Sequence, residues 1–224
     1  MILEAINISK SFYNNTGKLD VFSDLSLSIK KRDLITIMGP SGSGKSTLLN
    51  ILGTLETFDE GTLKINEKEI VKQNNDSLSK IRNQYLGFVF QFHHLIPEFD
   101  SIENVLLPQQ IYKNDLNDSY AKELLHFMGL SNRMNYYPSE LSGGERSRVA
   151  DARALINKPA IVLADEPSGN LDIGNAKQLI KLFEKINKEF DQSIVIATHD
   201  KEIASIGNKN YFLDKGSLSI SDTV

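Results

Sequence analysis

Nine residues, GPSGSGKST at 39–47, have the types and spacing that most clearly specify a chemistry. Small residues let backbone N–H groups curl around an anion, while a lysine and a hydroxyl beside them can hold phosphate charge and a metal ion. A glycine-rich turn without a ligand is the alternative, but here an apolar run precedes the stretch and the helical TLLNIL ends it. We therefore predict a nucleotide-phosphate site, with Lys45 on the β- and γ-phosphates and the Ser46 hydroxyl on Mg²⁺. Its members are Gly39, Pro40, Ser41, Gly42, Ser43, Gly44, Lys45, Ser46 and Thr47.

Two acids follow the four apolar residues of IVLADEP at 161–167. The apolar run predicts a buried strand, which would place Asp165 and Glu166 at a carboxyl end, where α/β sheets bind ligands. Asp165 would hold Mg²⁺ through its water shell, and Glu166 would polarise the attacking water. Acids that merely cap the next helix are the alternative, and the phosphate loop upstream disfavours it.

Two further polar residues end apolar runs. His199, in IVIATHD, would be a structural histidine in isolation, but beside a nucleotide it becomes a candidate sensor of the γ-phosphate. Gln91, after GFVF, carries a neutral amide that could touch the metal or the lytic water. A plain surface glutamine is the alternative for Gln91.

The stretch LSGGERSRVADARAL at 141–155 predicts a loop that opens into a helix, because none of the eleven residues that follow Gly144 is glycine or proline. The first N–H groups of such a helix attract an anion. No lysine, metal ligand or base stands beside this second anion-binding segment, the second cradle, in the sequence. It can therefore hold a phosphate but cannot hydrolyse one.

The bulk composition narrows the function classes. With 29 acidic and 25 basic residues the net charge is −4, which argues against a nucleic-acid partner. Cysteine is absent, so disulfides and cysteine-ligated zinc are excluded. Apolar runs stay far below the ~20 residues of a membrane helix, and the first ten residues lack the pattern of a signal peptide.

The elements that must position these residues alternate between strands and helices. Residues 2–8 and 21–29 alternate apolar and polar residues, as half-buried antiparallel strands do, and 62–65 is predicted to be an edge or hairpin strand. Continuous apolar runs predict central strands covered on both faces at 34–38, 86–90, 160–164 and 193–197. Apolar spacings of three and four predict amphipathic helices over 173–190 and 116–128.

This order predicts an α/β fold with a largely parallel sheet. We expect one domain over 1–224, in which 1–91 and 157–224 form the nucleotide-binding core and an antiparallel β subdomain. No strand is predicted between Gln91 and about Ile156, so 92–156 is expected to be an inserted helical subdomain that carries LSGGE.

The ordered set GPSGSGKST, Gln91, LSGGE, IVLADEP, SGNLD and THD resembles the ATP-binding-cassette ATPases over essentially the whole chain. The resemblance implies a P-loop NTPase (RecA-like) core that hydrolyses ATP with Mg²⁺, with Phe12 or its neighbour Tyr13 stacked on adenine. It also implies that Lys45, Glu166 and His199 are catalytic, that Ser46, Gln91 and Asp165 serve the metal, and that 168–172 is a subunit-contact loop. In a head-to-tail dimer, the second copy would supply Ser142, Gly143 and Gly144 in trans.

A narrower resemblance lies in FQFHHLIPEF at 90–99, PSELSGGER and LADEPSGNLDIGNA, which are similar to the ATPases of lipoprotein-releasing systems. It implies integral membrane permease subunits contacted through about 90–110, and lipoprotein cargo handled indirectly. The chain would then lie on the cytoplasmic face of the inner membrane as a peripheral subunit. Macrolide-export and cell-division cassettes share the remaining motifs and stay as alternatives, as does a soluble non-transport ATPase. For His93 and His94, packing on a membrane partner is favoured over metal binding and over plain solvation.

Two residues depart from the family pattern in the helix that follows LSGGE: Ser147 replaces a glutamine and Asp151 an apolar residue. An unpaired acid would be costly if buried. We therefore expect Asp151 to be exposed, or paired with Arg148 or another nearby arginine. Ser168 in place of threonine is a mild change.

Overall fold

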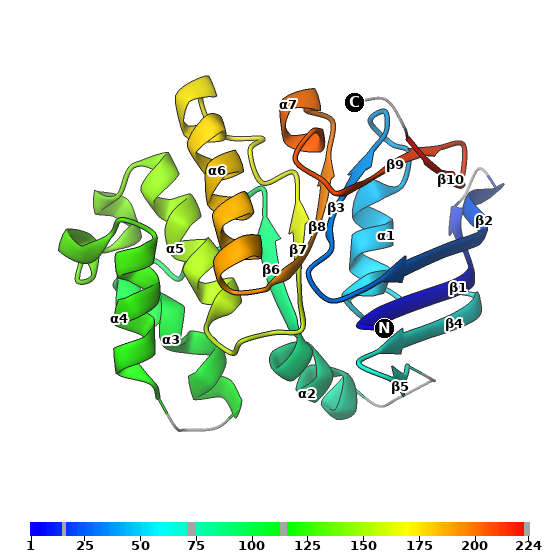
Figure 1. Ribbon diagram of the computed structural model, residues 1–224. Helices are drawn as coiled ribbons and strands as arrows, with labels where there is room; N and C mark the ends of the chain where they lie inside the picture. Colours follow the sequence, from blue (N-terminus) through cyan, green and yellow to red (C-terminus); the bar gives the residue numbers. More distant parts are fainter. Residues whose placement is uncertain (15–16, 71–74, 113–115, 222–224) are drawn as a thin grey trace.

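A six-stranded sheet forms the centre of the molecule (Figure 1). The computed structural model describes residues 1–14, 17–70, 75–112 and 116–221. Five neighbouring strands run parallel and β10 pairs antiparallel with β9 at one edge. The strand order is β10 (Ser217–Ile220), β9 (Lys209–Asp214), β3 (Leu34–Met38), β8 (Ser193–Thr198), β7 (Ile161–Asp165) and β6 (Leu86–Phe90). β9 and β10 lie in a part of the sequence for which no strand was predicted.

Alternate residues of the central strands serve two different cores. In β7, Leu163 packs in the core on one face of the sheet and Val162 in the core on the other. This burial on both faces is why the central runs are continuously apolar, and it confirms that interpretation for β3, β7 and β8. The placement of 86–90 was wrong, because β6 is an edge strand. Its outer side is covered by helices, so its composition resembles that of a central strand.

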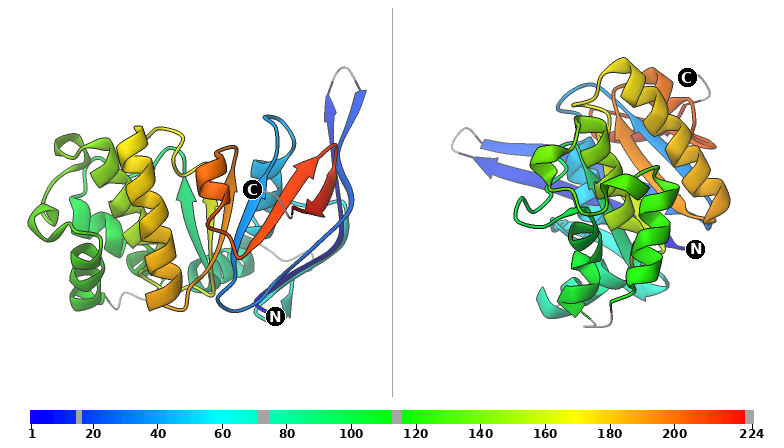
Figure 2. Two further views of the ribbon diagram at one scale, coloured as in Figure 1. Left: turned by 45° about the horizontal axis from the view of Figure 1, so that its top comes forward. Right: turned by 90° about the vertical axis from the view of Figure 1, so that its left-hand side faces the viewer.

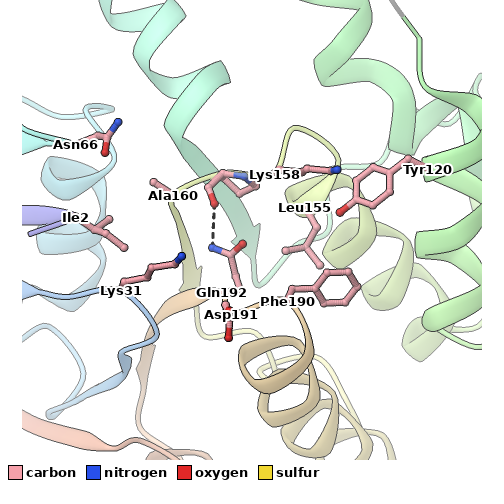
Figure 3. A pocket seen from close by; sticks show the side chains of 11 residues that line it. Ile2, Lys31, Asn66, Tyr120, Leu155, Lys158, Ala160, Phe190, Asp191 and Gln192 are labelled. Carbon is pink, nitrogen blue, oxygen red and sulfur yellow. Dashed lines mark hydrogen bonds between the residues drawn. The ribbon is translucent and has the colours of Figure 1, made fainter.

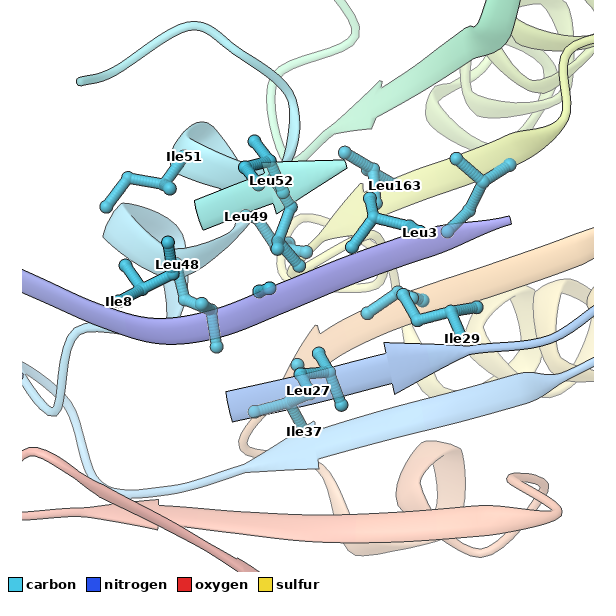
Figure 4. Packing of buried hydrophobic residues seen from close by; sticks show 14 of the residues in the cluster. Leu3, Ile8, Leu27, Ile29, Ile37, Leu48, Leu49, Ile51, Leu52 and Leu163 are labelled. Atoms are coloured by element: carbon cyan, nitrogen blue, oxygen red, sulfur yellow. The ribbon is translucent and has the colours of Figure 1, made fainter. Parts of the chain in front are cut away.

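A second, antiparallel sheet covers the face of the central sheet that carries α1 (Lys45–Leu52). Its order is β2 (Gly17–Ile29), β1 (Leu3–Asn14), β4 (Glu60–Ile65) and β5 (Lys68–Glu69). β1 and β2 extend well beyond the predicted 2–8 and 21–29, and β4 is a hairpin strand between β1 and β5. Leucine and isoleucine side chains from α1 and both sheets meet in the first core (Figure 4).

Helices cover the opposite face and build the second core (Figure 2). In the described part of the chain between Gln91 and Ile156, regular structure is helical only. The helices on this face are α3 (Ser101–Tyr112), α4 (Asp118–Phe127), α5 (Gly143–Leu155), α6 (Ile173–Glu189) and α7 (Lys201–Ala204), with short 3₁₀ turns at Ser131–Arg133 and Pro138–Glu140. α2 (Asn75–Tyr85) instead packs its buried Ile81 into the first core. The predicted helix 116–128 begins at Asp118, because Asn117 caps it by accepting a hydrogen bond from the Tyr120 backbone N–H.

Across the described ranges, every helix is too short or too polar to span a lipid bilayer.

Candidate nucleotide site

The phosphate loop connects β3 to α1. Met38 ends the strand and Lys45 begins the helix, with Gly44 as the N-cap residue. Gly42 and Gly44 have φ values of 79° and 99°, a left-handed backbone that favours glycine. The loop therefore winds back over the helix N-terminus, where free N–H groups attract an anion, and no acidic side chain occupies the first turn.

Lys45 is buried at the end of this loop, where α1 begins. Its ammonium donates hydrogen bonds to the Gly39 and Pro40 carbonyls over 2.9 and 3.2 Å. The Glu166 carboxylate lies 3.8 Å from the same nitrogen. The loop thus holds a positive charge next to an acid at the end of β7.

Asp165 and Ser46 meet across the gap between β7 and α1. The Ser46 hydroxyl hydrogen-bonds the Asp165 carboxylate, while burial, followed by the neighbouring Glu166, raises the pKa of Asp165. The Oδ1 atom of Asp165 is buried without a hydrogen-bond partner among the described residues. Mg²⁺ prefers such hard oxygen donors, so this pair fits the metal predicted from the sequence.

Glu166 and His199 form a hydrogen-bonded pair at the ends of neighbouring strands. His199 Nδ1 lies 2.8 Å from Glu166 Oε2, and the His199 backbone N–H donates to the same oxygen over 3.3 Å. Glu166 has a φ of 44°, an uncommon backbone for a residue other than glycine. Its amide donates to the Ala197 carbonyl over 2.9 Å, which fixes this turn against β8.

One open cavity of about 670 Å³ joins Lys45, Ser46, Glu166 and His199, whereas Asp165 is not among the residues that line it. Phe12 lines it from β1, whereas its neighbour Tyr13 does not and is 78% exposed. The Lys10 ammonium lies 4.7 Å from the centre of the Phe12 ring. The full lining consists of Phe12, Leu19, Val21, Ser41, Gly42, Gly44, Lys45, Ser46, Thr47, Glu166 and His199.

Gln91 lies beside the loop that follows Glu166. A Cβ atom added to Gly169 would come within 2.6 Å of the Gln91 side-chain nitrogen, so the two are in close contact. The Asn170 amide donates to the Gln91 carbonyl over 2.9 Å. From the sequence, Asn170 was expected only as part of the subunit-contact loop 168–172, and its bond to Gln91 was not predicted. Gln91 itself does not line the 670 Å³ cavity.

The second cradle is built as a helix start, separate from that cavity. Ser142 caps α5, its hydroxyl accepting from the Glu145 N–H over 3.2 Å, and the Glu145 carboxylate accepts from the Ser142 N–H over 2.8 Å. Gly144 allows close packing, since a Cβ there would lie 2.4 Å from Oδ1 of Asn175 on α6. Ser142, Gly143 and Gly144 are not among the residues that line the P-loop cavity of the same chain.

The expectation for Asp151 was wrong. Its side chain is 1% exposed, and neither carboxylate oxygen has a hydrogen-bond partner among the described residues. Burial raises its pKa to about 7, which the positive charge of Arg148 only partly offsets. Arg148 instead reaches Gln178 on α6, with 3.5 Å between Nη1 and Oε1. Asp151 follows Gly144 and Ser147 on one face of α5, and all three are buried there.

Two other cavities lie away from the P-loop. One, of about 420 Å³, is an apolar groove between the sheet core and the helices, lined in part by Leu55, Phe88, Phe90 and Ile111. The other, of about 580 Å³, is bordered by Lys31 and Lys158 (Figure 3). Gln192 also lines it and donates a hydrogen bond to the Pro159 carbonyl over 3.2 Å. It contains none of the predicted site residues.

Comparison with known proteins decides the family. The family model described as ABC transporter matches residues 22–169. The chain belongs to the ABC transporter family. It is similar to ABC proteins named lipoprotein-releasing system ATP-binding protein LolD. The one from Cytophaga hutchinsonii is 47% identical over 219 residues, covering 97% of this chain and 98% of that protein. The one from Bacteroides fragilis is 45% identical over 213 residues, covering 94% and 97%.

Solved ABC structures show the same fold. A dimeric post-hydrolysis state of the ATP-binding cassette MJ0796 bound to ADP and Pi superposes with a TM-score of 0.88 at 35% identity, covering 99% of this chain and all of that one. A second dimeric structure of that ABC transporter cassette also has a TM-score of 0.88, at 37% identity. The fold class and the family predicted from the sequence are confirmed.

Proposed function

We propose that this chain is the ATP-hydrolysing subunit of an ABC complex that releases lipoproteins from the inner membrane toward the outer membrane. The observation that carries the ATPase assignment is the cluster of Lys45, Glu166 and His199 around one phosphate loop. The lipoprotein assignment is supported by the names of the LolD relatives, which match this chain almost end to end.

Hydrolysis proceeds by in-line attack of water on the γ-phosphate. Glu166 orients the water and accepts its proton, and His199, held by Glu166, donates a hydrogen bond toward the γ-phosphate. Lys45 and the backbone amides of residues 39–47 balance the charge that develops on the phosphate oxygens. Phe12 stacks on the adenine, because it, rather than Tyr13, lines the cavity.

Mg²⁺ would be held by the Ser46 hydroxyl, by Asp165 through water, and by the Gln91 amide. When bound, it neutralises phosphate charge. The partnerless Oδ1 of Asp165 supports this assignment. Gln91 further links the site to the helical subdomain, which we place at 92–156.

The complete site needs a second copy of the chain. Ser142, Gly143 and Gly144 form a phosphate-binding helix start that does not line its own chain's cavity. A head-to-tail pair with two-fold symmetry would close each such helix over the partner's nucleotide, giving two composite sites. The dimeric form of the MJ0796 cassette supports this arrangement.

Membrane subunits dock at residues 90–110. Phe92 and Ile111 are 66% and 73% exposed, and Leu55 is also exposed at the rim of the 420 Å³ groove. Exposed apolar side chains beside an apolar groove favour a protein partner. The chain would then be a peripheral subunit on the cytoplasmic face of the inner membrane, and the permease rather than this chain would contact the cargo.

The test is to purify the tagged chain from detergent-solubilised membranes and to identify what accompanies it. Integral membrane subunits are expected, and recovery of ribosomes or DNA instead would overturn the transport assignment. The purified complex in vesicles should then release a lipoprotein in an ATP-dependent manner, whereas a Glu166→Gln complex should not. A complex that hydrolyses ATP but releases no lipoprotein would contradict the cargo assignment alone.

A further inference from the structure

Arg153, near the C-terminal end of α5, binds two consecutive backbone carbonyls about sixty residues away in the chain. Its Nη2 donates to the His93 carbonyl and its Nη1 to the His94 carbonyl, both over 2.7 Å. Burial lowers the pKa of Arg153. A planar guanidinium can satisfy two acceptors at once, which a lysine ammonium at the same place matches poorly.

The segment that Arg153 holds is irregular and uncommon in its backbone. Residues 91–96 follow β6 with no helix or strand, and His94 has a φ of 48°. A left-handed residue other than glycine persists only where its surroundings determine it. The His94 ring packs edge-on against Phe90, with 5.5 Å between the ring centres. Arg153 therefore restrains this turn at His93 and His94, while Asn104 on α3 holds its end by accepting from the Ile96 N–H over 2.8 Å and donating to the Ile96 carbonyl over 3.0 Å.

The first residue of the same segment contacts the loop that follows Glu166. Gln91 contacts Gly169, and the Asn170 side chain donates a hydrogen bond to the Gln91 carbonyl. A displacement of Gln91 would therefore also displace the loop after Glu166. The exposed Phe92 follows directly. Arg153 thus binds the turn one and two residues beyond Phe92, from the helix that Ser142 caps. Ser142 and Arg153 are about 16 Å apart along that helix.

We propose that Arg153 is a positioning residue that fastens residues 91–94 to α5, so that a displacement of this turn by a membrane partner moves the helix and its N-terminal serine. The coupling role rests on the proposed function, whereas the fastening itself does not. Without the guanidinium, the turn would move independently and the serine would stay where it was.

The test compares Arg153→Lys with Arg148→Lys as the matched control. Both substitutions retain the charge and lie on α5, but Arg148 reaches Gln178 on α6, and its hydrogen bonds among the described residues include none to residues 91–94. Hydrogen exchange of the amides in 92–96 is measured on the isolated chain, together with its kcat and KM for ATP. ATP hydrolysis is then measured in the complex with its membrane subunits.

In Arg153→Lys, amide exchange in 92–96 should accelerate at least tenfold, while kcat and KM of the isolated chain stay within twofold of the wild type. Stimulation of hydrolysis by the membrane subunits should fall at least fivefold. Arg148→Lys should change none of these quantities. Arg153→Gln, which keeps one amide donor, serves as the second variant and should give the same pattern.

Unchanged exchange in both Arg153 variants would overturn the fastening. Faster exchange with full stimulation would overturn the coupling, as would an equal loss of activity in the isolated chain and in the complex. If the wild-type chain recruits no membrane subunits, the proposed function fails, and the exchange measurement still decides whether Arg153 holds the turn.

Discussion

His199 Nδ1 and Glu166 Oε2 lie 2.8 Å apart, although 33 residues separate them in the chain. Both residues stand at carboxyl ends of adjacent parallel strands, β8 and β7, so the register of these two strands sets the distance. The imidazole and the carboxylate consequently act as one unit facing the P-loop cavity.

His199→Ala should reduce kcat on the order of 10²-fold, because a preorganised donor to the developing phosphate charge is lost. The KM for ATP should change little, since Lys45 and the loop amides remain. Steady-state hydrolysis measured over a range of ATP concentrations checks this. Activity close to that of the wild type would remove the histidine from the site.

Glu166→Gln should keep ATP binding and lower turnover by at least ~10²-fold, the range that general-base catalysis supplies. The amide is isosteric and retains a hydrogen bond to His199, so the fold should not change. Nucleotide binding and single-turnover hydrolysis separate the two effects. Near-normal hydrolysis would exclude Glu166 as the base.

Ser142→Arg should leave ATP binding to the single chain intact, because this residue does not line the cavity of its own chain. It should abolish hydrolysis and ATP-driven dimerisation, since a bulky cation would occupy the interface. Sedimentation with and without ATP provides the measurement. Full activity, or a rate strictly proportional to protein concentration at high dilution, would contradict a composite site.

Asp151 should make the fold less stable as pH rises. Its pKa is near 7 in the folded chain and about 3.9 when unfolded, so between these values the folded state binds more protons and stability falls with increasing pH. The loss should reach about 2 kcal/mol between pH 5.5 and pH 8. Asp151→Asn should remove this decline. Denaturant titration at the two pH values measures the free energy of unfolding of each variant. Asp76→Asn, on the surface of α2, is the control. An unaltered pH dependence in Asp151→Asn would refute the prediction.

The phosphate loop, the acids of IVLADEP and the cap of α5 were all predictable from the sequence, because each depends on neighbours within a few residues. A strand followed by glycines and a helix produces its own anion site wherever it lies. The continuous apolar runs likewise predicted strands buried on both faces. The order of the strands in the sheet could not be predicted from the sequence, as the edge position of β6 shows. Helices can cover an edge strand as fully as a central one, so both have the same apolar composition.

The strands β9 and β10 were not predicted, because exposed and buried residues alternate only weakly along them.

The environments of Asp151 and Arg153 depended on packing rather than on the local sequence pattern. α5 is rich in small residues and is buried on several sides, so its periodicity could not reveal which side chain would be enclosed. The packing of α5 against its neighbours left Asp151 without a partner and brought Arg153 to two carbonyls of a distant turn. Short stretches of sequence therefore determined the types of chemical group at the site. The contacts between those stretches were decided only by the packing of the helices and strands.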